Sequence, residues 1–90
     1  MTTSAKIACT LSDVMFHNEY AVEIAISGGK TASFFMDKEL VILNGSKRSG
    51  YIKANVIKKG SVDCAVLLPK EAIEEGTRWV NVPRNEIEFA

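Results

Sequence analysis

The feature that most constrains this chain is an alternation of apolar and polar residues with a period of two. It is clearest over residues 19–26, where the inward set is Tyr20, Val22, Ile24 and Ile26. Side chains of a β-strand point alternately to the two faces of a sheet, so the pattern predicts a strand with one buried face. Gly28 and Gly29 follow, and two glycines between extended runs are typical of a hairpin turn. The partner strand is expected over residues 30–36.

Gly29, Lys30 and Thr31 also match the end of the phosphate-binding loop of many nucleotide hydrolases. That loop needs a second glycine five positions earlier and must open a helix. Ile24 occupies the earlier position, in the middle of the expected strand, and the residues that follow, TASFFMD, favour a strand. The sequence therefore predicts a hairpin here and no ATP-binding loop.

The same period predicts further strands over residues 6–11, 51–58, 62–68 and 78–82, and a short last strand within 84–89. The inward residues of the first three are Ile7, Cys9 and Leu11; Ile52, Ala54 and Val56; and Val62, Cys64, Val66 and Leu68. Tyr51, Lys53 and Asn55 are expected to point outward.

Three segments are less regular. Residues 35–43 fit either a buried strand, because Val41 and Ile42 are β-branched, or a short helix with Met36, Leu40 and Leu43 on one face. Residues 44–50 are expected to form a polar, basic loop. Over residues 69–76, a proline at the start and a glycine at the end predict one or two helical turns.

Ninety residues, 47% of them hydrophobic, are enough for one domain with its own core. The expected fold is all-β, a single small antiparallel SH3-like barrel of residues 1–90 with five to seven short strands and one short helical turn near 69–76. A β-rich α+β fold is the alternative.

Two segments resemble known families. WVNVPRNEIEF, residues 79–89, resembles the closing segment of SH3-like barrels, with a strand, a turn begun by proline and a final strand. Recognition of proline-rich peptides is not implied, because the acidic, tyrosine-rich motif and the ligand-facing aromatic pair of true SH3 domains are missing. VIKKGSVDCAVLLPKEAIEEG, residues 56–76, is similar to AbrB-like swapped-hairpin DNA-binding domains. That likeness implies nucleic-acid contacts by Lys58 and Lys59 and a helix beginning at Pro69.

Eleven basic and eleven acidic residues balance, so no global field draws the chain to nucleic acid or membrane. Residues 44–60, however, carry five cations and no carboxylate. With Tyr51 among them, and a neighbouring strand beginning at Arg78 and Trp79, they form a candidate binding surface. Its residues are Lys47, Arg48, Tyr51, Lys53, Lys58, Lys59, Arg78 and Trp79. The structural alternatives are lysines that protect an edge strand from aggregation and a tryptophan that belongs to the core.

Catalytic candidates are few. His17 is the only histidine and lies near Asp13 and Glu19, which is compatible with a general base, although a loop histidine is more often simply exposed. Cys9 and Cys64 are in phase with apolar neighbours and are expected to be buried free thiols. No metal site, cofactor or catalytic role is therefore expected.

The first expectation for function is a non-catalytic binding or assembly module that recognises another protein or a second copy of itself through a sheet edge. The alternative is an RNA- or DNA-binding barrel that uses the basic 47–59 surface. A small hydrolase acting through His17 is third. No secretory signal or membrane span is recognisable in the sequence, so a cytoplasmic location is expected.

Overall fold

The computed structural model describes residues 3–13, 18–46 and 48–89. Within these residues the chain is all-β, as expected, and every paired strand is antiparallel. The strands are β1 (Thr3–Asp13), β2 (Glu19–Ile26), β3 (Lys30–Asp37), β4 (Val41–Ser46), β5 (Ser49–Lys59), β6 (Asp63–Leu67), β7 (Trp79–Pro83) and β8 (Ile87–Phe89). Two 3-10 turns, η1 (Lys38–Leu40) and η2 (Arg84–Glu86), complete the described part. The eight strands exceed the five to seven expected because the irregular stretch after residue 35 supplies a strand of its own.

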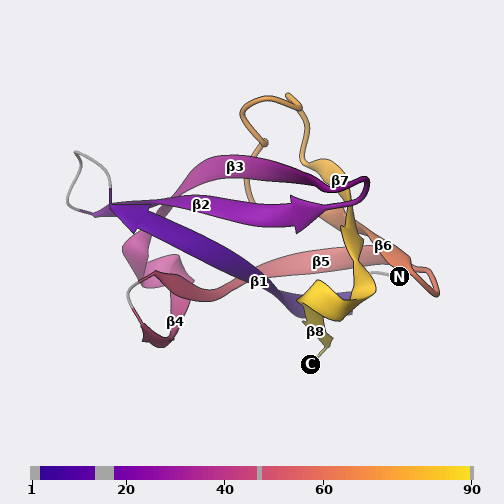
Figure 1. The fold of residues 1–90 in the computed structure, drawn as a ribbon, viewed down its shortest axis with the longest axis horizontal. Coiled ribbons are helices and arrows are strands. Elements are labelled where there is room, and N and C mark those ends of the chain that lie inside the picture. The colour runs from indigo at the N-terminus through magenta and orange to yellow at the C-terminus, as the bar shows by residue number, and fades with distance from the viewer. Residues whose placement is uncertain (1–2, 14–17, 47, 90) are drawn as a thin grey trace.

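One sheet holds all of these strands in the order β3-β2-β1-β5-β6-β7, with β4 paired to β5 and β8 paired to β1 (Figure 1). The long strand β1 connects the parts of the sheet. Its residues 3–10 pair with β5, residues 5–7 pair with β8 along the other edge, and residues 10–13 pair with β2. The sheet curls until the end of β2 meets β7, where Ser27 N donates to Asn81 O at 2.8 Å. The result is a barrel-like shell around one core.

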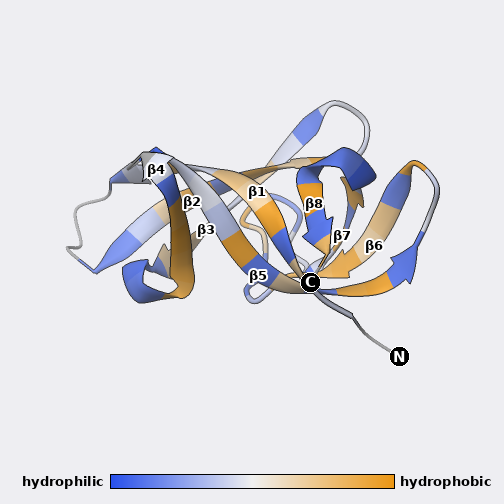
Figure 2. Cartoon of the chain, turned by 90° about the horizontal axis from the view of Figure 1, so that it is seen from below, coloured by the Kyte–Doolittle hydropathy of each residue, from blue (hydrophilic) through white to orange (hydrophobic). Residues whose placement is uncertain are grey.

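The core consists of the inward residues of the alternating pattern, seen in Figure 2 as orange bands separated by paler or blue ones. The largest fully buried side chains are Phe34, Ile7, Ile24, Ile52, Leu68, Val22, Val56, Val66, Val82 and Cys64. Burial of each large aliphatic or aromatic side chain contributes about 1.5–3 kcal/mol. Both cysteines are buried and free, as expected.

Residues 35–43 resolve into strand, turn and strand. β3 ends at Asp37, η1 follows, and β4 begins at Val41, so the alternative of a helix is wrong. The expected fully buried strand is only partly right, because Val41 is buried whereas Leu40 and Leu43 are 54% and 47% exposed. The expected loop at 44–50 is also wrong, because β4 continues to Ser46 through a bulge and β5 begins at Ser49.

The segment between β6 and β7 forms one helical turn and no helix. Gly76 N donates to Ala72 O at 2.8 Å, and Gly76 has a φ of 66°, which is the left-handed conformation expected where a turn ends. Ala72 is buried against the core, and Ile73 N donates to Ser33 O, so this segment covers the outer edge of β3. The helix at Pro69 implied by the AbrB-like resemblance is absent.

Two further expectations concern the last strands. Val62 is 72% exposed, because it lies in the turn before β6, so the inward face of that strand begins at Cys64 and not at Val62. The strand, proline-initiated turn and final strand expected over residues 79–89 are present as β7, η2 and β8. The described part of the chain holds no helix with the length and hydrophobicity of a transmembrane segment.

Candidate binding surface

Strand β5 places alternate side chains on the outer face of the sheet, away from the core. Tyr51 is partly exposed and Lys53 and Asn55 are exposed, whereas each residue between them is buried. The strand is long and belongs to three ladders, with β1 along one edge and β4 and β6 along the other. Its outward residues therefore lie near the middle of a sheet and have neighbours on both sides.

The register extends this face across four strands. Asn55 pairs with Ser4 on β1 and with Leu67 on β6, and Leu67 pairs in turn with Trp79 on β7. With adjacent strands about 4.8 Å apart, Trp79 lies on the order of 10 Å from Asn55. Trp79 is 57% exposed, so it belongs to the surface and not to the core.

A pair of lysines lies at the centre of this face. Lys6 on β1 is directly opposite Lys53 on β5, and on its other side Lys6 pairs with Glu88 of β8. Like charges in a directly opposed pair are unfavourable, and the carboxylate of Glu88 offsets only part of the positive charge of the two lysines. Sequence reasoning missed Lys6 because cross-strand register, which pairs it with a residue far away in the chain, is not readable from alternation.

The two adjacent lysines at the end of β5 diverge. A bulge between Val56 and Lys58 shifts the register, and Lys58 then pairs with the outward residue Ala65. Lys59 faces the other way, and its Nζ lies 4.5 Å from the centroid of the Phe89 ring. Phe89 pairs with the buried Ala5 and packs against the core. Lys59 therefore lies on the inward side of the sheet, opposite to the side of Lys58.

The structure brings some of the predicted residues together on one face of the sheet and separates the others. We define the outer β5 surface as Ser4, Lys6, Tyr51, Lys53, Asn55, Lys58, Leu67 and Trp79. Arg78 lies at its rim, and its Nε donates to Leu68 O at 2.7 Å. Arg48 is in the turn between β4 and β5, and Lys59 faces the other side. Lys47 and His17 lie outside the described residues.

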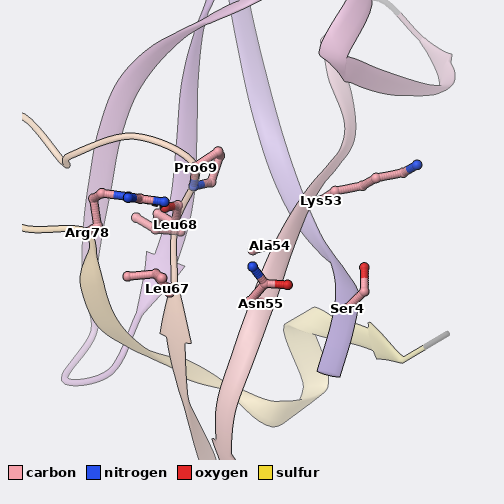
Figure 3. Close-up of a pocket in the computed structure, with 8 residues that line it drawn as sticks. All are labelled: Ser4, Lys53, Ala54, Asn55, Leu67, Leu68, Pro69 and Arg78. Atoms are coloured by element: carbon pink, nitrogen blue, oxygen red, sulfur yellow. Dashed lines mark hydrogen bonds between the residues drawn. The ribbon is translucent and has the colours of Figure 1, made fainter. Parts of the chain in front are cut away.

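A pocket of about 130 Å³ opens where the rim meets this surface (Figure 3). Its lining residues are Ser4, Lys53, Ala54, Asn55, Leu67, Leu68, Pro69 and Arg78. Arg78 extends across one side toward Leu68 and Pro69, while the Lys53 side chain points away on the opposite side. Ligand pockets for organic molecules usually have 300–1,000 Å³, so this one suits a small group only.

The two thiols are poor nucleophiles. Burial raises the pKa of the Cys9 thiol to about 11, and the weaker effect of a hydrogen bond with the Gly50 backbone opposes that rise. A thiol with this pKa holds almost no thiolate at neutral pH, and Cys64 is completely buried. Among the described residues, no three or more histidine, cysteine or carboxylate side chains cluster in a way that could hold a metal ion.

Comparison of the chain with protein-family models, curated proteins and solved structures finds no match. The resemblances to SH3-like barrels and to AbrB-like domains therefore depend on residues 79–89 and 56–76 alone. The interpretation of the outer β5 surface depends on its own geometry.

Proposed function

We propose that this protein is a non-catalytic binding module that holds single-stranded RNA or DNA on the outer β5 surface. The observation that carries the proposal is the position of exposed Trp79 on the same sheet face as the opposed pair of Lys6 and Lys53. Barrel proteins that bind single strands combine a cationic groove for the backbone with aromatic rings on which bases stack.

Each part of the surface has a role in this proposal. Phosphates neutralise Lys6, Lys53 and Lys58, which removes the unfavourable opposition of the first two. A base stacks on the Trp79 ring, at a distance from the lysines that a nucleotide or two can bridge. Tyr51, the next outward residue beyond Lys53 on the same strand, provides a second ring.

Fluorescence anisotropy with labelled single-stranded oligonucleotides tests the proposal. Contacts to three lysines predict a slope of log K against log salt of about −2, because each neutralised phosphate of a single strand contributes about −0.7. Trp79→Ala is expected to weaken binding about tenfold, since stacking is worth about 1–3 kcal/mol per base. Phe35→Ala is the matched control, because Phe35 is 46% exposed on β3, outside the surface. Absent or salt-independent binding, or equal effects of the two variants, would contradict the proposal.

Recognition of another protein, the first expectation from the sequence, is the second candidate and is supported by the edge of β4. Among the described strands, β4 pairs only with β5, and its sequence VILNGS contains no lysine or proline of the kind that usually protects an edge. Leu43 is 47% exposed there. The edge of β3, by contrast, is covered by the segment that contains Ile73. An extended segment of a partner, or β4 of a second copy, fits such an edge by strand addition.

Light scattering coupled to gel filtration tests this second candidate. Leu43→Lys is expected to abolish self-association or capture of an extended partner, because an edge lysine opposes strand addition. Val62→Lys, at a 72% exposed residue away from β4, should leave it intact. If the two variants behave alike, or the wild-type chain is monomeric and captures nothing, the second candidate fails.

The fold and location belong to the same proposal. The turn that follows Pro83 and the pairing of β8 with β1 support an SH3-like arrangement of the barrel. Two buried free cysteines are compatible with a reducing compartment, which supports a cytoplasmic location.

A further inference from the structure

Another pocket, of about 270 Å³, lies beside Trp79 at the place where the curled sheet closes. Its lining comes from three parts of the chain that the fold brings together, namely the turn between β2 and β3, the segment that precedes β7, and β7 itself (Figure 1). The volume is close to the lower limit for pockets that take organic molecules, about 300 Å³. The pocket can therefore receive one small ring system.

Part of the lining is apolar. Ile26 and Val80 are buried residues of the core that also reach the pocket, and Trp79 beside them is 57% exposed. Two aliphatic side chains and an indole ring suit a flat aromatic group, whose faces are apolar and whose edge is polar. A nucleobase is such a group, and stacking of a base on Trp79 is already part of the proposed function.

The polar part of the lining contains groups of complementary kinds. Lys30 only donates hydrogen bonds, the Glu75 carboxylate only accepts them, and the Asn81 amide does both. All three side chains are exposed, and neither charged one belongs to an ion pair among the described residues. A donor and an acceptor are therefore both ready for the edge of a ligand.

The hydroxyl of Ser27 points to a polar ligand independently. Ser27 Oγ is buried, and it is the one such side-chain atom without a hydrogen-bond partner among the described residues that are not exposed. A buried hydroxyl is unfavourable unless it is paired. Ser27 also lines the pocket, and rotation about its single χ1 bond can bring the hydroxyl to a ligand there.

Hydrogen bonds of the main chain hold the lining in place. Ser27 N donates to Asn81 O at 2.8 Å, which ties the hairpin to β7. On the other side, Gly76 N donates to Ala72 O at 2.8 Å and closes the turn that carries Glu75. A pocket that is formed before its ligand arrives loses less conformational freedom on binding.

The bases differ in how they fit these groups. On its Watson–Crick edge, guanine has two adjacent donors, N1–H and the 2-amino group, next to the acceptor O6. A carboxylate accepts both donors, and an ammonium donates to O6. Adenine and cytosine offer a carboxylate one amino group, and uracil has a carbonyl oxygen on each side of its single N–H.

We infer that this pocket is a guanine-binding subsite, in which Glu75 accepts from N1–H and the 2-amino group, Lys30 donates to O6 and the ring stacks on Trp79. The inference rests on the proposed function and deepens it. The lysines of the outer β5 surface attract any single strand, and the pocket selects the base that is held at Trp79.

Fluorescence anisotropy with labelled nonamers of uridine, varied only at the central base, tests the preference. A central guanine is expected to bind about tenfold more tightly than adenine or uracil, which is the usual size of one bidentate contact to a base. Hypoxanthine, which keeps N1–H and O6 but lacks the 2-amino group, should lie between guanine and adenine.

A matched pair of variants tests the role of the carboxylate. Glu75→Gln keeps the shape of the side chain but replaces one acceptor atom by a donor, so it should reduce the ratio of guanine to adenine affinity at least fivefold. Glu74→Gln is the control, because this exposed neighbour loses the same charge but lies outside the pocket. If the two variants keep the same ratio, or the wild-type chain shows no preference for guanine, the inference is overturned and the proposed function stands.

A ¹⁵N NMR titration of the full chain with guanosine monophosphate separates the two proposals further. Saturable shifts are expected at the indole N–H of Trp79 and at the side-chain amide of Asn81, and uridine monophosphate should cause none. If guanosine monophosphate binds in this way but no strand binds, the subsite stands and the proposed function fails. Shifts that centre elsewhere overturn the subsite, and the absence of binding by both the nucleotide and every strand overturns both proposals.

Discussion

The β2–β3 hairpin and the strand β5 arise from the same alternating pattern of apolar and polar residues, but they differ in how continuously their backbones pair with neighbouring strands. In the hairpin, pairs run without a shift from Glu19 with Asp37 to Ile26 with Lys30. Along the outer edge of β5, the pairing with β4 ends at Ile52, the pairing with β6 begins at Asn55, and a bulge precedes Lys58. One region is a continuous ladder, and the other is a ladder broken twice.

The outer faces of the two regions also differ in their charge. The hairpin carries Glu19, Glu23 and Asp37 on its outer side, whereas the outer β5 surface carries three lysines and a tryptophan. A continuous ladder satisfies its own backbone groups, so only its side chains can meet a ligand. In the proposed function, the hairpin stabilises the fold and β5 supplies the binding surface.

The largest expected effect lies in the hairpin. Phe34→Ala should lower the free energy of unfolding by about 3–5 kcal/mol, because Phe34 is 1% exposed and its loss leaves a cavity. The adjacent Phe35, on the outer face, should cost less than about 1 kcal/mol when changed to alanine. Urea unfolding monitored by circular dichroism measures both. Equal losses would mean that the hairpin does not face the core as described.

A smaller effect is expected where β4 meets β5. A Cβ at Gly50 would overlap the carbonyl oxygen of Ile42, so Gly50→Ala must push the two strands apart. We expect a loss of about 1–3 kcal/mol in unfolding free energy, the usual cost of overpacking. Ser49→Ala, on the same strand, is the control. If Gly50→Ala left the free energy of unfolding unchanged, β4 would not pack against β5 as described.

The divergence of Lys58 and Lys59 sharpens the comparison further. Lys58→Ala should weaken oligonucleotide binding about fivefold and leave stability unchanged. Lys59→Ala should leave binding unchanged and lower the free energy of unfolding by about 0.5–1 kcal/mol, because it removes the contact of a cation with the Phe89 ring. Anisotropy and urea unfolding on both variants provide the measurements. If Lys59→Ala weakened binding while Lys58→Ala lowered stability, or if the two variants behaved identically, the two lysines would not face opposite sides of the sheet as described.

An effect confined to high pH is expected at Cys9, on the strand between the two regions. Its pKa of about 11 in the native state lies above the ordinary value of 9.0, so the unfolded chain loses this proton first as the pH rises. The stability contributed by the neutral thiol is complete below pH 9 and is lost as the pH rises through 11. Cys9→Ala should therefore show a shallower fall in urea midpoint between pH 8.5 and pH 10.5 than the wild type. A fall of equal slope would contradict the raised pKa.

Alternation was sufficient to predict the all-β fold, the hairpin and most of the core. The β2–β3 pattern was readable because each inward residue is large and apolar and two glycines mark the turn. Residues 35–43 were ambiguous because an apolar run has no period, and only the neighbours decide that Val41 is buried and Leu43 is not. Tertiary contacts also decide how far Pro69 and Gly76 extend a helical turn.

The site was predictable only in part. Tyr51 and Lys53 followed from alternation within one strand, but a bulge that sends Lys58 and Lys59 to opposite faces has no clear signal in the local sequence. The opposition of Lys6 and Lys53 and the neighbourhood of Trp79 depend on which strands pair and in what register. The change of partner along β5, from β4 to β6, depends on where those two strands lie, which the residues of β5 do not encode.

The fluorescence of Trp79, the only tryptophan in the chain, tests the central claim most directly. Titration with a single-stranded oligonucleotide should quench this emission saturably, with an apparent affinity that falls steeply as salt increases, and Lys53→Glu should shift the curve to higher concentration. Glu23→Gln, on the outer face of the hairpin, should leave the curve in place. Saturable binding, detected by anisotropy, that leaves Trp79 emission unchanged would contradict the assignment of the outer β5 surface.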